Sequence, residues 1–308
     1  MKILVTGGAG FIGSHIVDAL VKKGIQVSVL DNLSTGLIKN INPTAKLFRK
    51  DIRDVDIKEL FLAEKFDCVI HEAAQTTVSK SLVNPYYDCE VNILGLVNLL
   101  EASRVSGVKR FVFASSAAVY GDTEILPIAE NCDKWPTSFY AESKLTGEHY
   151  LEKYYRNFGL EYVILRYANV YGERQADSGE GGVISIFLKN LLLGNICTVY
   201  GDGNQTRDYV YVKDVAEANC QALVTNQVNR SFNISTGIET SLNELIAVLG
   251  QLAKQFPSIT YASPRSNDIK RSVLDNRAAQ IELSWKPVFS LEAGLYLMMR
   301  ELDIKITA

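Results

Sequence analysis

A phenol and an ammonium group one helical turn apart are the first residues in this chain that suggest acid–base chemistry. Tyr140 and Lys144 are four positions apart in the run Tyr-Ala-Glu-Ser-Lys, so a helix would present both on one face. A cation beside a phenol favours the phenolate and lowers the pKa of the phenol, so we expect Tyr140 to act as a base near neutral pH. The alternative is a solvated surface pair, because the chain has 15 tyrosines.

Hydroxyl groups upstream of this pair favour the chemical interpretation. Residues 110–113 form an apolar run that predicts a buried strand, and Ala-Ser-Ser-Ala-Ala-Val-Tyr-Gly follows it at 114–121. Ligands of parallel α/β sheets bind at the carboxyl ends of the strands. A serine hydroxyl in this segment is therefore expected to hydrogen-bond a substrate oxygen.

A glycine-rich turn near the start of the chain indicates a phosphate-bearing ligand. Gly8, Gly10 and Gly13 form Gly-x-Gly-x-x-Gly between a predicted strand at 2–6 and a predicted helix at 11–22, and Gly7 adds a second glycine spacing. Glycines there allow a tight turn and a close approach of the backbone to a pyrophosphate, while the helix N-terminus offers free N–H donors. This strand–turn–helix context predicts a dinucleotide site.

Two acidic positions extend the expected dinucleotide site. Asp31 ends the second predicted strand, 18 residues after the last glycine of the turn, where its carboxylate can accept hydrogen bonds from the ribose hydroxyls. It would repel a 2′-phosphate, so NAD is expected rather than NADP unless Lys39 and Arg49 supply compensating charge. Asp51 and Ile52 follow the third predicted strand and are expected to contact the adenine, the alternative being an ordinary aspartate at a strand end.

The elements that must position these residues alternate along the chain. Strands are predicted near 27–30, 47–48, 66–70, 110–113 and 162–165, with helical patterns at 56–63, 91–104 and 140–157. This order predicts an α/β fold of Rossmann type, a doubly wound parallel sheet with a smaller mixed α/β C-terminal substrate lobe. We expect a cofactor domain at 1–171, with 208–235 returning to it, and an interleaved smaller lobe at 172–308.

Composition excludes several other functions. The 308 residues carry 32 Lys+Arg and 35 Asp+Glu, a net charge of −3, which provides no basic field for nucleic acid or an anionic membrane. Five scattered cysteines and three histidines argue against a metal site. The absence of a signal segment or a run of about 20 apolar residues favours a cytoplasmic protein. An anionic ligand must therefore be held by local groups.

Taken together, these motifs resemble the extended short-chain dehydrogenase/reductase family, and within it the UDP-hexose 4-epimerases, over essentially the whole chain. The resemblance implies that Ser116 is the catalytic hydroxyl, Tyr140 the acid/base, and Lys144 the residue that binds the nicotinamide ribose. Glu72 stands where many relatives have an apolar residue. The cofactor contacts implied are Gly7, Gly10, Phe11, Ile12, Gly13, Asp31, Asn32, Asp51, Ile52, Ala73, Ala74, Lys80, Asn92, Tyr140 and Lys144, although Asn92 could equally be a helix residue bonded to local backbone.

The substrate diphosphate needs cations in a protein of this charge, and Arg207 and Arg265 are the candidates. Both stand in segments similar to those of the family, although Ser266 and Asn267 replace the usual Pro-Gly after Arg265. By the same resemblance Asn169, Ser116 and Tyr140 bind the substrate. The residue seven positions after the second arginine, Ser272, lines the pocket for the 2-substituent of the sugar, where a small residue leaves room for an N-acetyl group.

The resemblance implies an isomerase that inverts position 4 of a UDP-hexose through a transient 4-keto sugar, using tightly bound NAD and working as a homodimer. UDP-glucose and UDP-galactose are the expected substrates, together with the N-acetylated pair. A UDP-glucuronate or pentose 4-epimerase is the alternative that is hardest to exclude. A 4,6-dehydratase is disfavoured because Ala117 and Ala118 replace the Asp-Glu of such enzymes, and a non-catalytic NAD sensor because both Tyr140 and Lys144 are present.

Overall fold

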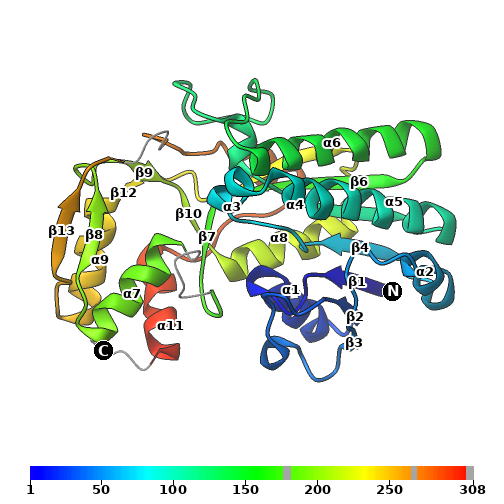
Figure 1. The fold of residues 1–308 in the computed structure, drawn as a ribbon, viewed down its shortest axis with the longest axis horizontal. Helices are drawn as coiled ribbons and strands as arrows, with labels where there is room; N and C mark the ends of the chain where they lie inside the picture. The colour runs from blue at the N-terminus through cyan, green and yellow to red at the C-terminus, as the bar shows by residue number, and fades with distance from the viewer. Residues whose placement is uncertain (176–181, 265–268, 303–308) are drawn as a thin grey trace.

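The computed structural model describes residues 1–175, 182–264 and 269–302, and a seven-stranded parallel sheet lies at its centre (Figure 1). Buried runs such as Ile3–Val5 leave no side chain of the strand exposed, as expected of a sheet covered on both faces. The doubly wound sheet predicted from the sequence is confirmed. Its strands, in spatial order, are β11 (Arg230–Ile234), β6 (Glu161–Tyr167), β5 (Arg110–Ser116), β4 (Cys68–His71), β1 (Lys2–Thr6), β2 (Gln26–Leu30) and β3 (Lys46–Phe48).

The strand order reverses at β1, and this reversal determines where a ligand can bind. β1 pairs with β2 on one side and with β4 on the other, both in parallel. The connection after β1 therefore runs towards β2 and the connection after β4 runs the other way, towards β5. The loops at the carboxyl ends of these two strands separate to open a crevice. Thr6, His71, Ser116 and Tyr167 end their strands at this edge.

Helices cover both faces of the sheet (Figure 1). Apolar side chains of one face pack against α1 (Phe11–Lys22), α8 (Val212–Val224) and α10 (Arg277–Glu282). Those of the other face pack against α2 (Ile57–Glu64), α5 (Gly95–Ser106) and α6 (Phe139–Phe158). In the described ranges no helix combines the length and the apolar character needed to cross a bilayer.

A second apolar cluster forms the region at the left of Figure 1. Helices α7 (Val183–Leu193), α9 (Leu242–Ala253) and α11 (Leu291–Glu301) pack there around short strand pairs. The pairs are β7 (Asn169–Tyr171) with β10 (Tyr209–Tyr211), β8 (Cys197–Tyr200) with β13 (Ile259–Ala262), and β9 (Thr206–Arg207) with β12 (Thr240–Ser241). α8 packs on α1, and β11 is an edge strand of the main sheet. The domain boundaries themselves stay a prediction.

Short helical segments are the main departures from the predicted elements. The predicted helix at 91–104 begins as a π-helical turn, Glu90–Leu94, before α5. Two further helices, α3 (Val78–Val83) and α4 (Pro85–Cys89), precede it. Asn84 caps α4 by accepting from the Tyr87 N–H at 3.0 Å, and Pro85 takes the first helical position. Within the described ranges, 3₁₀ turns occur at Ile38–Asn40 and Ala117–Tyr120.

A buried ion pair connects the elements that meet at the active edge of the sheet. Arg166 on β6 and Glu148 on α6 form a two-pronged contact, with 4% and 6% of their side chains exposed. Glu148 also accepts from the Ser115 hydroxyl at 2.6 Å, and Arg166 donates to the Tyr120 hydroxyl at 2.8 Å. β5, β6, α6 and the 3₁₀ turn are thus fixed relative to one another.

Removing one partner of this pair should leave an uncompensated buried charge. We expect Glu148→Ala to lower the free energy of unfolding by about 3 kcal/mol, measured by urea denaturation. Glu152→Ala, which breaks an exposed ion pair with Arg156 on the same helix, should cost less than about 1 kcal/mol. Equal losses in the two variants would contradict the structural importance given to the buried pair.

Candidate active site

The crevice at the strand reversal is a cleft of about 850 Å³ that brings together nearly all the predicted site residues. It extends from the ends of β1, β2 and β3, past the ends of β4, β5 and β6, to β9. The predicted residues that line it are Gly7, Gly10, Phe11, Ile12, Gly13, Asp31, Asn32, Asp51, Ile52, Ala73, Ala74, Lys80, Ser116, Tyr140, Lys144, Asn169, Arg207 and Ser272. Arg265 lies outside the described residues.

The glycine turn brings backbone into contact with backbone. A Cβ on Gly13 would lie 2.2 Å from the Gly7 carbonyl oxygen, and one on Gly7, whose φ is +69°, would lie 2.6 Å from the Ala73 nitrogen. Larger residues would therefore force β1, α1 and the loop after β4 apart. No side chain caps α1, and no acidic residue lies in its first turn. Its N-terminal N–H groups and the positive end of its dipole therefore face the cleft without a competing carboxylate.

The acidic end of the cleft is fixed by backbone and by one arginine. Asp31 accepts from the Ala9 N–H at 2.9 Å and from the Leu33 N–H at 2.8 Å, and 7% of the residue is exposed. Asp51 accepts from the Arg53 guanidinium at 2.8 Å and from the Asn32 side-chain amide at 2.8 Å. The bond from Arg53 is the main reason that the pKa of Asp51 lies well below its usual value. The Asp51 carboxylate is therefore held as a charged acceptor, and the Asp31 carboxylate is fixed in orientation by two backbone N–H groups.

The proposed catalytic side chains meet where β5 ends and α6 begins. Ser116 is the last residue of β5, and its hydroxyl accepts from the Ala118 N–H at 3.2 Å. Ser138 caps α6 by accepting from the Ala141 N–H at 3.2 Å, so Tyr140 lies in the first turn of the helix, where it hydrogen-bonds to Ser116. Lys144, one turn later, is 5% exposed. Phenol, hydroxyl and ammonium thus share one cleft wall.

The expected lowering of the Tyr140 pKa by Lys144 is not found in the protein alone. Burial of the phenol raises the pKa of Tyr140 to about 12, and the bond from Ser116 offsets this in part. The Lys144 ammonium donates to the Ala114 carbonyl at 2.8 Å and lies over the Phe113 ring, so its charge is directed at the β5 backbone. A positive charge placed beside the phenol would lower its pKa.

The far end of the cleft carries the expected substrate residues. Arg207, on β9, donates from Nη1 to the carbonyl oxygens of Thr206 at 2.8 Å and Ile269 at 2.7 Å, which fixes the orientation of the guanidinium. Asn169 starts β7 and Ser272 is half-buried in the opposite segment. A cation, an amide and a small residue are therefore present for the part of a ligand beyond the catalytic group.

Asn92 differs from the other predicted cofactor residues because it is buried behind the cleft wall. Its side-chain oxygen accepts from the Gln75 N–H at 2.8 Å, and its amide nitrogen donates to the Gln75 carbonyl at 2.9 Å and to the Ser143 hydroxyl at 3.0 Å. It lies in the π-helical turn and joins the loop after β4 to α6. Its role as a cofactor contact stays a prediction.

Several cleft residues were not among the predicted contacts. Glu72 and Tyr167 follow or end buried strands at the same sheet edge as Ser116, which was the available signal. Gln75, Arg174 and Gln175 also line the cleft, from loops for which the sequence offers no periodic pattern. The side-chain oxygen of Gln175 is buried without a hydrogen-bond partner.

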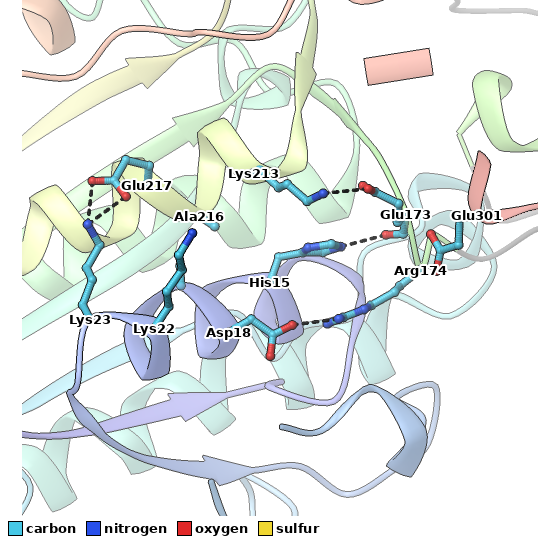
Figure 2. A pocket seen from close by; sticks show the side chains of 11 residues that line it. His15, Asp18, Lys22, Lys23, Glu173, Arg174, Lys213, Ala216, Glu217 and Glu301 are labelled. Atoms are coloured by element: carbon cyan, nitrogen blue, oxygen red, sulfur yellow. Dashed lines mark hydrogen bonds and ion pairs between the residues drawn. The ribbon is translucent and has the colours of Figure 1, made fainter. Parts of the chain in front are cut away.

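A second hollow, of about 650 Å³, lies between α1, the loop after β7, and α8 (Figure 2). Three ion pairs line it: Arg174 with Asp18 at 2.7 Å, Lys213 with Glu173 at 2.8 Å, and Lys23 with Glu217 at 3.1 Å. His15 on α1 bonds the Glu173 carbonyl at 2.9 Å. These contacts hold together α1, α8 and the loop that carries Arg174. The hollow is therefore a structural contact region behind the cleft.

Known proteins match this chain over nearly its whole length. The model of the NAD dependent epimerase/dehydratase family matches residues 3–235. A putative UDP-glucose 4-epimerase of Methanocaldococcus jannaschii is 49% identical over 294 residues, which is 95% of each chain. The crystal structure of UDP-glucose 4-epimerase from Thermotoga maritima with UDP-glucose has a TM-score of 0.96 at 42% identity and covers 98% of this chain and 99% of its own. The Thermus thermophilus enzyme complexed with NAD has a TM-score of 0.93 at 41% identity, with the same coverage.

Proposed function

Because the chain belongs to the NAD dependent epimerase/dehydratase family, we propose that it is an isomerase that inverts position 4 of a UDP-hexose with tightly bound NAD. The observation that carries the proposal is one cleft that contains the glycine turn, Asp31 and the group Ser116, Tyr140 and Lys144. UDP-glucose and UDP-galactose are the expected pair, as in the relatives named above. The cytoplasmic location predicted from the sequence is supported by five cysteines that are all free thiols.

The residues present fit NAD at the β1 end of the cleft. The uncapped first turn of α1 suits a pyrophosphate. Gly7 and Gly13 pack closely against neighbouring backbone, so the pyrophosphate can approach the backbone of the turn. The oriented Asp31 carboxylate suits two ribose hydroxyls and opposes a 2′-phosphate. When bound, NAD⁺ supplies the hydride acceptor for the sugar carbon and a cationic ring in the cleft.

Tyr140 is the group suited to move the proton of the sugar 4-hydroxyl. Its phenol is bonded to Ser116, so a sugar oxygen can take up bonds from both groups at once. The phenolate accepts the hydroxyl proton as the carbon is oxidised and returns it after the keto sugar has turned over. Lys144 supplies positive charge and donors on the same wall. Arg207 holds the diphosphate, so that the sugar can rotate while the nucleotide stays bound.

Apolar side chains after Ser116 support epimerisation over dehydration. Ala117 and Ala118 line the cleft in the 3₁₀ turn, where elimination of water would need an additional acid and base. UDP-glucuronate or pentose epimerisation stays the alternative, because only the shape and charge of the sugar pocket would distinguish it.

Tyr140→Phe should abolish the reaction while preserving the fold. The variant keeps the ring but loses the proton acceptor, so kcat for interconversion of UDP-glucose and UDP-galactose should fall at least about 100-fold, measured by NMR. Tyr155→Phe, which removes an exposed hydroxyl from the same helix, serves as the control and should retain most of the activity. A Tyr140→Phe protein with the parent rate would refute the assigned role.

Ser272 sets the proposed breadth of sugar specificity. It is half-buried and lines the cleft, so its small side chain leaves space that an N-acetyl group can fill. We therefore infer that UDP-GlcNAc and UDP-GalNAc are accepted as well as the plain hexoses.

Ser272→Tyr should reduce kcat/KM for the N-acetylated pair roughly tenfold or more relative to the plain pair, since the ring occupies the space of the acetyl group. Ser272→Ala keeps a small residue and should leave the ratio unchanged. A ratio that is the same in all three proteins would eliminate Ser272 as the determinant.

We also propose that the protein forms a homodimer through the helices at 91–104 and 140–157. Apolar side chains stay exposed there in the single chain, including Leu94 at 59%, Tyr150 at 38% and Phe158 at 56%. Burying them against the same helices of a second copy would remove a large apolar patch from water.

Light scattering should report about twice the 34.1 kDa of one chain, and Leu94→Glu should shift the protein to the single-chain mass, because the new charge would lie in the helix interface. Leu192→Glu, a similarly exposed position on α7, is the matched control and should remain dimeric. A parent protein with the single-chain mass would rule out the dimer.

A further inference from the structure

One half-buried acid in the cleft has no part in the proposed chemistry. Glu72 directly follows β4 and lines the cleft together with Tyr140 and Lys144. A carboxyl group removed from water is costly unless a partner compensates it. Its neighbours should therefore show why it is tolerated.

A chain of hydrogen bonds holds this carboxyl group from one side. The Tyr167 hydroxyl donates to Glu72 Oε1 at 2.7 Å, and the Asn219 amide donates to the same hydroxyl at 2.8 Å. Asn219 is fully buried on α8 and also donates to the Val215 carbonyl at 3.0 Å. Tyr167 pairs with Ser116 across β6 and β5. The carboxyl is thus held by the strand neighbour of the proposed catalytic serine.

Glu72 interacts with three titratable groups: Lys144 and Tyr140 on α6, and Tyr167 on β6. Two further groups act on the same pair: Asp88 on α4 interacts with Lys144 and Tyr140, and His71 on β4 interacts with Lys144. Burial raises the pKa of Glu72 and lowers that of Lys144, and their opposite charges partly offset both effects. The Glu72 charge also adds to the burial that raises the pKa of Tyr140.

The other two groups differ from Glu72 in how they are held. Burial lowers the pKa of His71 to about 3, so this ring stays neutral and bonds the Thr6 hydroxyl at 2.7 Å. The Asp88 carboxylate acts on both Lys144 and Tyr140 in the same direction as Glu72, raising the pKa of each. This carboxylate accepts hydrogen bonds from the side-chain amides of Gln75 at 2.8 Å and Asn92 at 3.2 Å. Asp88 is not among the residues found to line the cleft.

We propose that Glu72 is a positioning residue for the reaction: its carboxylate keeps the buried Lys144 as an ammonium ion and sets the pH at which Tyr140 releases its proton. The proposal rests on the epimerase function proposed above. A negative charge stabilises the protonated form of both neighbours. Removing the charge must therefore let Tyr140 and Lys144 lose their protons at lower pH.

The test is the pH dependence of kcat/KM for UDP-glucose in the parent protein, Glu72→Gln and Glu72→Asp. The acidic limb of this pH profile reports the pKa of the base, Tyr140, and the basic limb reports the pKa of the Lys144 ammonium group. In Glu72→Gln both limbs should move to lower pH by roughly one unit, the size expected of one nearby charge in a partly buried site. Glu72→Asp retains the charge and should keep the parent profile. A purely structural role would lower the rate at all pH values without moving either limb.

Infrared spectroscopy provides a second readout that does not depend on turnover. The parent protein should gain the band of a protonated carboxyl group as the pH falls from mildly alkaline to mildly acidic, and Glu72→Gln should lack this increment. If Glu72→Gln does not fold, Tyr167→Phe removes the donor to Glu72 and should move the limbs in the same direction by a smaller amount. A parent protein that does not epimerise contradicts the proposed function, whereas an active parent with limbs unmoved in the variants overturns the role of Glu72.

Discussion

The contact on which the site depends is the buried ion pair between Arg166 and Glu148. The proposed catalytic residues lie next to members of this network: Ser116 follows Ser115, and Lys144 precedes Glu148 by four residues on α6, with Tyr140 one further turn away. A buried pair of charges costs desolvation energy, which is recovered only when the geometry is well matched. The pair therefore favours one arrangement of β5, β6 and α6. This arrangement sets the positions of the proposed reacting groups, which these elements carry.

Charge in the cleft is balanced locally, as the net charge of −3 requires. The first turn of α1 and Arg207 offer positive potential at two separate points suited to two diphosphates. Between them, burial opposes ionisation of Tyr140 and favours the neutral form of Lys144, while Glu72 favours the ammonium form. The protein alone is thus poised with Tyr140 protonated, and the cationic ring of NAD⁺ would supply the charge that makes the phenol more acidic.

Periodic patterns of apolar residues predicted helices and strands that the structure contains. The apolar spacing from Phe11 to Lys22 and the buried runs near Val69 and Val112 mark elements that the structure contains. The glycine turn and the order of strands and helices then predicted where the cleft lies, because the carboxyl ends of parallel strands meet at one edge of the sheet. Short-range patterns could not reveal the π-helical turn that directs Asn92 away from the cleft, nor the bond between Tyr167 and Glu72, which are far apart in the sequence. The direction of the Tyr140 pKa was missed because spacing alone does not measure burial.

The account is tested most directly by incubating the purified protein with UDP-glucose in deuterium oxide, with no cofactor added, and following the sugar by NMR. If NAD is retained in the cleft and the hydride returns to the carbon that it left, UDP-galactose should form with its original hydrogen at position 4. Inversion accompanied by deuterium at that carbon would contradict the account. No inversion from a folded protein, with NAD also absent from the nucleotides released on denaturation, would contradict it equally.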